Sequence, residues 1–98
     1  MNEHGTHLID GEWGDGANTA TSANPARPDE PVGTYALGDA STADAAIGAA
    51  AAALPGWAAT PFTTRAKLME RAATLIDERL EELATLCTLE EGKTIGES

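Results

Sequence analysis

The sequence predicts an α/β chain, or α+β if the chain is taken alone, with short strands first and helices after them. Three observations lead to this class. An Asp-Gly turn lies between apolar residues near the N-terminus, a proline-rich stretch leads into alternating residues at 32–37, and a helical period runs from about residue 39 to residue 91. We therefore divide the chain into a β-hairpin and short-strand segment, residues 1–38, and a helical segment, residues 39–98.

The stretch HLIDGEW predicts the first hairpin. Asp10-Gly11 suits a tight turn because both central residues of a type I′ turn need positive φ. Leu8, Ile9 and Trp13 supply the apolar contacts of the two short strands. Residues 14–22 are small and polar, which predicts a loop leading into a short strand.

The next stretch, NPARPDEPVGTYALGD, predicts turns followed by a strand. Pro25, Pro28 and Pro31 favour extended or turn geometry, since proline fixes φ and has no amide hydrogen. The strand is expected over residues 32–37.

A first helix is expected to begin at Asp39 or Ser41, which can accept a hydrogen bond from the free amides of a first turn. The Pro-Gly pair at 55–56 is expected to end it. Trp57 and Phe62 then fall in the connection, where aromatic side chains fill gaps between packed helices. One face of the helix carries Ile47, Ala50, Ala51 and Leu54.

A second helical region is expected to begin at Thr63 or Thr64. Its apolar period shifts phase at residues 78–79, which predicts a bend or two abutting helices. Gly92 is expected to end the helix in the left-handed conformation. The period is carried by Leu68, Ala72, Leu75, Ile76, Leu80, Leu83, Leu86 and Cys87.

The amino-acid composition limits the size of core, the kinds of partner and the cellular location that we expect for this chain. Alanine accounts for 20 of the 98 residues, and Leu, Ile, Val and Phe together for 15, so an independent core is doubtful. The net charge of -10 excludes basic surfaces for nucleic acid or anionic lipid. No apolar run is long enough to span a bilayer, and the N-terminus lacks signal-peptide features. With Cys87 as the one cysteine, we expect a cytoplasmic protein.

Three local patterns invite functional interpretations that we reject. Gly92-Lys93-Thr94 resembles the end of a phosphate-binding loop, but Cys87 stands where that motif needs glycine, and the triplet follows a helix. His4 and His7 could share a metal ion, yet a terminal pair is more often solvated. Cys87 lies on an apolar helical stripe, which favours a buried small hydrophobe over a nucleophile.

The order and spacing of several motifs resemble the N-terminal segment of the aldehyde dehydrogenase superfamily. The resemblance runs from about Leu8 to Ser98 and includes IDGEW, the Asn24-Pro25 pair, ADAAI, PGWAATP, RAKLMERAATLIDER and LEEGK. The proline-rich NPARPDEPVG departs from the commoner Asn-Pro-Ala-Thr-Gly-Glu turn of the family and is similar to branches acting on semialdehydes such as α-ketoglutarate semialdehyde or pyrroline-5-carboxylate. The resemblance implies that residues 39–98 are part of an incomplete cofactor-binding domain.

The resemblance also implies a reaction. In the family, a cysteine thiolate attacks an aldehyde, hydride passes to NAD or NADP, and water activated by a glutamate releases the carboxylate. These groups lie downstream of the matched segment, so we expect no catalytic or cofactor-binding residue here and no activity from the 98-residue chain alone. Expected partners are the rest of the dehydrogenase fold or homo-oligomer neighbours. A structural monovalent cation would use a carbonyl of Ser22 or Ala23 and the carboxylate of Glu90.

An alternative of a different class is a small acidic interaction module without catalytic activity. It would bind a partner through the apolar stripe between Leu68 and Leu89. A cooperative thermal transition of the isolated chain would favour this module, whereas gradual melting or exposed apolar surface would favour the dehydrogenase segment.

Overall fold

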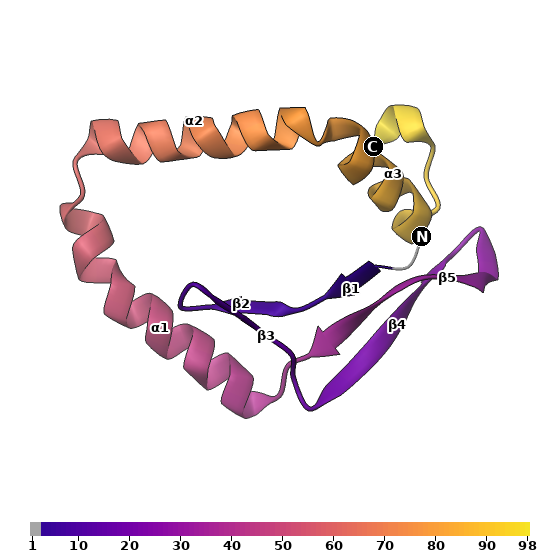
Figure 1. Ribbon diagram of the computed structural model, residues 1–98, viewed down its shortest axis with the longest axis horizontal. Helices are drawn as coiled ribbons and strands as arrows, with labels where there is room; N and C mark the ends of the chain where they lie inside the picture. Colours follow the sequence, from indigo (N-terminus) through magenta and orange to yellow (C-terminus); the bar gives the residue numbers. More distant parts are fainter. Residues whose placement is uncertain (1–2) are drawn as a thin grey trace.

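A computed structural model describes residues 3–98 and places the strands before the helices, which confirms the predicted class (Figure 1). Two small sheets lie together, and three helices frame one side of them. The elements are β1 (Glu3–Gly5), β2 (His7–Ile9), β3 (Glu12–Gly14), β4 (Asn18–Asn24), β5 (Arg27–Leu37), α1 (Ala40–Ala59), α2 (Phe62–Glu78), α3 (Leu80–Glu91) and the 3₁₀ turn η1 (Ile95–Glu97).

The predicted hairpin is confirmed as the antiparallel pair β2–β3. Asp10 and Gly11 form its turn with φ of 54° and 75°, as a type I′ turn requires. Leu8 pairs with Trp13 across the strands. Both side chains are exposed, so the hairpin contributes no core of its own.

The second sheet has the order β1-β5-β4, with β1 parallel and β4 antiparallel to β5. The parallel pairing of β1 was not predicted, because a three-residue strand carries no period of its own. Both long strands also start earlier than predicted. The prolines are tolerated in β5 because Pro28 and Pro31 lie beyond the β1 pairing and beside the irregular end of β4, where Ala23 faces Pro31.

Helix α1 starts where predicted but ends later. The Asp39 side chain caps it, forming a reciprocal capping box with Thr42. The prediction that the 55–56 pair ends the helix is wrong, since the helix continues through Pro55 to Ala59. Strong helix-forming alanines on both sides offset the bond that proline removes, and the helix ends where the Thr60 hydroxyl donates to the Gly56 carbonyl at 2.8 Å.

The α1 cap makes helix content dependent on pH. The pKa of Asp39 is lowered to about 2, first because the Ser41 hydroxyl donates to its carboxylate and then through the amide and hydroxyl of Thr42. A lowered folded-state pKa means that the stabilisation is present above about pH 4 and is lost as pH falls toward 2. We expect circular dichroism to show helix loss over this window in the native chain. Asp39→Asn keeps a capping oxygen without a titrating group, so equal acid sensitivity of that variant contradicts this assignment.

The second helical region divides as predicted, with α2 ending at Glu78 and α3 beginning at Leu80. Arg79 lies between them in a non-helical conformation. The expected place of the aromatic residues is wrong: Trp57 belongs to α1 and Phe62 opens α2, and their side chains are 44 % and 75 % exposed. Over residues 3–98 no single helix is long and apolar enough to cross a membrane; α1 and α2 reach that length and composition only as a pair bent by 120°.

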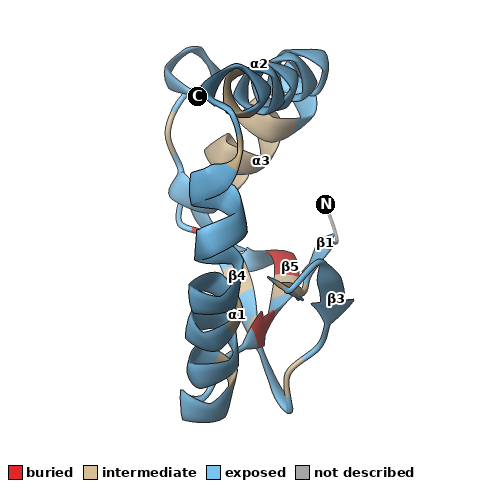
Figure 2. Cartoon of the chain, turned by 90° about the vertical axis from the view of Figure 1, so that its left-hand side faces the viewer, coloured by how far each residue is buried: buried red, intermediate tan, exposed pale blue. Residues whose placement is uncertain are grey.

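Very little of the described chain is buried, and most of the cartoon in Figure 2 has the colour of exposed residues. Val32 and Ala36 are the buried apolar residues among residues 3–98, and Asn24 is buried beside them. The accessible area is 7377 Å², whereas a compact monomer of 10.1 kDa exposes about 5,300 Å². The radius of gyration is 16.9 Å, against about 12.6 Å for a compact domain of 98 residues. The chain thus exposes roughly 2,000 Å² more than a self-contained domain.

Candidate functional site

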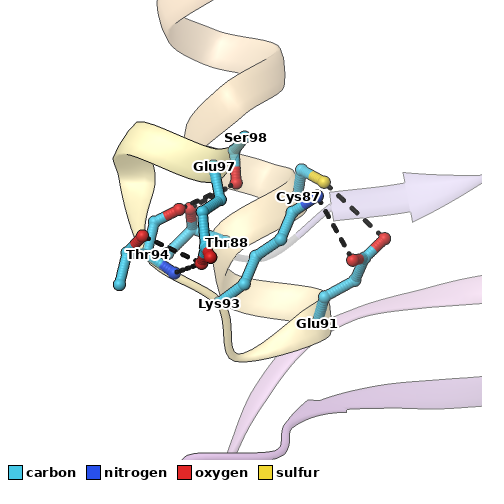
Figure 3. A network of polar contacts seen from close by, with 7 residues as sticks. All are labelled: Cys87, Thr88, Glu91, Lys93, Thr94, Glu97 and Ser98. Carbon is cyan, nitrogen blue, oxygen red and sulfur yellow. Dashed lines mark hydrogen bonds and ion pairs between the residues drawn. The ribbon is translucent and has the colours of Figure 1, made fainter.

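The Gly92-Lys93-Thr94 triplet ends a helix and does not form a phosphate-binding loop (Figure 3). Gly92 has φ of 72°, and its amide donates to the Thr88 carbonyl at 2.8 Å, which closes α3. Thr94 then caps η1, where its amide and hydroxyl both donate to the Glu97 carboxylate. A phosphate-binding loop needs free backbone amides and follows a strand. The amides of Gly92 and Thr94 instead donate hydrogen bonds within the chain, and the triplet follows a helix, so these observations disfavour a nucleotide site.

Cys87 lies in the same network rather than in a buried apolar stripe. Its thiol is half-buried and donates to the Glu91 carboxylate with a sulfur to oxygen distance of 3.7 Å. The ammonium of Lys93 lies 3.4 Å from the same carboxylate. Glu91, by hydrogen bonding, and then the Cys87 sulfur raise the pKa of Lys93. The prediction of a buried cysteine is wrong, because Cys87 is only half-buried and its thiol contacts a carboxylate.

The elements that carry the predicted cation ligands lie next to each other. Ser22 and Ala23 are on β4, and Glu90 is in the last turn of α3, which packs against β4 and β5. A Cβ built on Gly92 would lie 3.4 Å from the Pro25 ring, so the end of the helix touches the turn after β4.

The backbone at the end of β4 departs from a regular ladder. Register shifts occur on both sides of Ala23, which faces Pro31, a residue with no amide hydrogen to donate. Beside it lies a small cavity of about 190 Å³ between Asn24, Val32 and Leu89. Backbone carbonyl oxygens at an irregular strand end, together with the carboxylate of a neighbouring helix end, are the kind of oxygen ligands that suit a hard cation.

Both N-terminal histidines lie in strands rather than in a frayed terminus, and the side chain of His4 is 44 % exposed, as expected for a solvated residue. His4 bridges the Thr34 hydroxyl at 2.7 Å and the Asp15 carboxylate at 2.8 Å, which ties β1 and β5 to the loop before β4. The Nε2 atom of His7 is enclosed and has no hydrogen-bond partner among the described residues. Within residues 3–98, no three His, Cys, Asp or Glu side chains are placed to share a metal ion. Sequence carried no signal for the His4 bridge, since its partners lie 11 and 30 residues away.

A wide groove of about 650 Å³ separates the β2–β3 hairpin from α1. Its floor on the helix is made of small side chains such as Ala45 and Ala49, and Trp13 and Asp15 line the opposite side. Alanines leave this space open because they do not reach across to the hairpin. The groove was not predicted from the sequence, although the run of alanines that forms one of its walls can be seen there.

The aldehyde dehydrogenase family model matches residues 13–98. The chain is 36 % identical over 95 residues to an alpha-ketoglutarate semialdehyde dehydrogenase of Haloferax volcanii, and 34 % identical over 91 residues to an N-succinylglutamate 5-semialdehyde dehydrogenase of Burkholderia mallei. It is 39 % identical over 93 residues to the succinate-semialdehyde dehydrogenase (NADP(+)) of Escherichia coli K12.

These matches cover 95 %, 93 % and 93 % of this chain but only 20 %, 19 % and 19 % of the relatives, so the chain spans about a fifth of their length. The matched residues include the hairpin residue Trp13, the β4–β5 pair and all three helices. The predicted resemblance is thereby confirmed, and the chain belongs to the aldehyde dehydrogenase family, of which it is an N-terminal segment.

Proposed function

We propose that the chain is the N-terminal part of an NAD(P)-dependent oxidoreductase that converts a semialdehyde to the corresponding carboxylate. The observation that carries the proposal is the family match over residues 13–98, together with relatives whose names all specify a semialdehyde substrate. Those three semialdehydes each carry a carboxylate at a distance from the aldehyde, which defines the proposed substrate class. We place the enzyme in the cytoplasm, with homo-oligomer partners.

Within this enzyme the segment acts as scaffold. The described thiol, Cys87, is engaged with Glu91 and lies beside a helix end. The resemblance implies that the family nucleophile lies downstream of this segment. The bound nicotinamide cofactor would supply the hydride acceptor. The segment's own contribution is to present α1, α2 and the strand pair β4–β5 to the part of the fold that binds substrate and cofactor.

The test is a chimera in which this chain replaces the matching segment of the Escherichia coli succinate-semialdehyde dehydrogenase. We expect the chimera to form reduced nicotinamide in the presence of succinate semialdehyde and NADP, and the isolated 98-residue chain to form none. Aldehyde-dependent reduction by the isolated chain contradicts the scaffold role. A soluble, folded chimera without activity contradicts the proposed function.

We also propose that the end of β4 and the end of α3 supply part of a monovalent cation site. The ligands would be a carbonyl of Ser22 or Ala23 and the carboxylate of Glu90. The support is the register shift at Ala23, the proline opposite it, and the packing of α3 on β4.

Removal of the cation tests this site. We expect the melting temperature of the chimera to fall when sodium and potassium are replaced by choline at constant ionic strength. Glu90→Gln should remove most of this difference, because a neutral amide holds a cation less strongly than a carboxylate. Glu81→Gln is the matched control on the exposed start of the same helix. Equal sensitivity of the two variants contradicts the assignment of Glu90.

A further inference from the structure

Helix α2 carries a set of exposed large apolar side chains, which we call the α2 stripe. At 100° per residue its members fall within an arc of about 140° on the helix. All are between 42 % and 75 % exposed, and no residue of α2 is buried. The α2 stripe comprises Phe62, Leu68, Met69, Leu75 and Ile76.

The opposite side of α2 is polar. It carries Lys67, Glu70, Thr74, Asp77 and Glu78. A helix that is apolar on one side and charged on the other normally packs its apolar side against a core. Here α2 makes its main contacts with α3 at one end and runs apart from both sheets (Figures 1 and 2). Its apolar side therefore has no counterpart among the described residues.

A second, independent feature lies on the same side of α2. Arg65 falls inside the arc of the α2 stripe, one turn before Leu68. Its Nε atom is enclosed but has no hydrogen-bond partner among the described residues. Because an enclosed N–H without an acceptor is unfavourable, the surface that covers the α2 stripe is expected to bring an acceptor to this point.

We propose that the α2 stripe is the docking surface for the downstream part of the dehydrogenase chain, which covers it with apolar side chains and places a carboxylate opposite Arg65. The inference rests on the proposed function and names the surface through which the segment is held. A planar guanidinium pairs with a carboxylate through two parallel hydrogen bonds. Such a pair sets the position of the covering element along α2 and also strengthens its binding.

Two quantities favour this occupant over a second copy of the chain. The relatives are about five times as long as the matched segment, so a large covering element exists in the family. The excess exposed area of roughly 2,000 Å² exceeds the ~800 Å² that each partner buries in a standard interface. In a symmetric dimer through α2, the two Arg65 side chains would approach the same apolar patch without an anionic partner.

The chimera with the Escherichia coli enzyme tests the docking surface through two matched pairs of variants. Leu68→Asp places a carboxylate in the α2 stripe, and Thr74→Asp places the same group on the polar side of the same helix. Arg65→Gln removes the cation whose Nε atom has no partner within residues 3–98, and Lys67→Gln removes a cation from the polar side. The readouts are the yield of folded protein, the melting temperature and the formation of reduced nicotinamide.

We expect Leu68→Asp to lower the yield of folded chimera at least about tenfold, because an unpaired carboxylate becomes enclosed in an apolar interface. Arg65→Gln should lower the melting temperature by roughly 5 °C, and Arg65→Lys should recover part of that loss. Thr74→Asp and Lys67→Gln should stay close to the parent chimera.

Other outcomes separate the two proposals. If both members of each pair behave alike, the α2 stripe is not the docking surface, even if the chimera is active. A folded chimera without activity refutes the proposed function, while the melting comparison still decides on the docking surface. If the parent chimera aggregates to the same extent as the Leu68→Asp variant, the docking proposal is overturned. It is also overturned if the isolated chain forms a dimer and Leu68→Asp dissociates that dimer.

Discussion

The isolated 98-residue chain is expected to unfold gradually on heating, without a cooperative transition. Among residues 3–98, the buried apolar residues are Val32 and Ala36, and neither belongs to a helix. Burial of apolar area is the main favourable contribution that offsets the loss of conformational entropy on folding. A chain that buries so little apolar area is not expected to unfold in one cooperative transition. Helical segments that lack tertiary packing melt independently over a wide range of temperature.

Circular dichroism and dye binding measure this directly. The helix signal should decline smoothly between low and high temperature, and a dye specific for exposed apolar surface should bind at room temperature. The parent chimera is the control, because in it the same segment should melt together with the rest of the protein. A single sharp transition of the isolated chain contradicts the expectation and revives the acidic interaction module, in which the stripe between Leu68 and Leu89 binds an external partner.

Gly33→Ala is expected to detach β1 from the sheet and to destabilise the chimera by about 3 kcal/mol. A Cβ on Gly33 would clash with the carbonyl oxygen of Glu3, and the Glu3 amide lies only 3.0 Å from the same point. Both are backbone atoms of β1, so the strain is relieved only if the strands separate. That separation also breaks the contact between His4 and Thr34.

Gly48→Ala is the matched control for this substitution. Gly48 lies inside α1 with open space around its Cα, so alanine there should stabilise the helix by roughly 0.5–1 kcal/mol. The measurement is chemical denaturation of the two chimera variants. A Gly33→Ala variant as stable as the parent contradicts the parallel β1–β5 pairing.

Local chemistry made some parts of this fold predictable. The Asp10-Gly11 turn needs two positive φ angles, the Asp39 cap needs a short acceptor before a helix, and Gly92 needs the left-handed conformation. Each of these requirements is met within a few residues of sequence. The interruption near Arg79 was equally visible, because the apolar period changes there.

Features that depend on distant partners were not predictable in the same way. The pairing of β1 with β5 joins residues 30 apart through strands too short to show a pattern. The course of α1 through Pro55 reflects a balance between neighbouring alanines and one lost hydrogen bond. At the candidate cation site, the resemblance indicated Ser22 or Ala23 together with Glu90, but the proline opposite Ala23 became meaningful only once the register was known.

The identity of the relatives disfavours the interaction module. The family match runs over residues 13–98 and so includes the whole of α2, whose apolar side the interaction module would use. The exposed apolar side chains of the helices are expected for one segment of a larger fold, because large exposed apolar patches mark surfaces that another part of a protein covers.

The central claim is that this segment works as part of a much larger dehydrogenase. The most direct measurement is the intact mass of the protein that carries this sequence, captured from its native source with an antibody to residues 39–98. The account predicts a mass about five times the 10.1 kDa of this chain, in line with its relatives. A mass near 10.1 kDa, with no longer product, would contradict it.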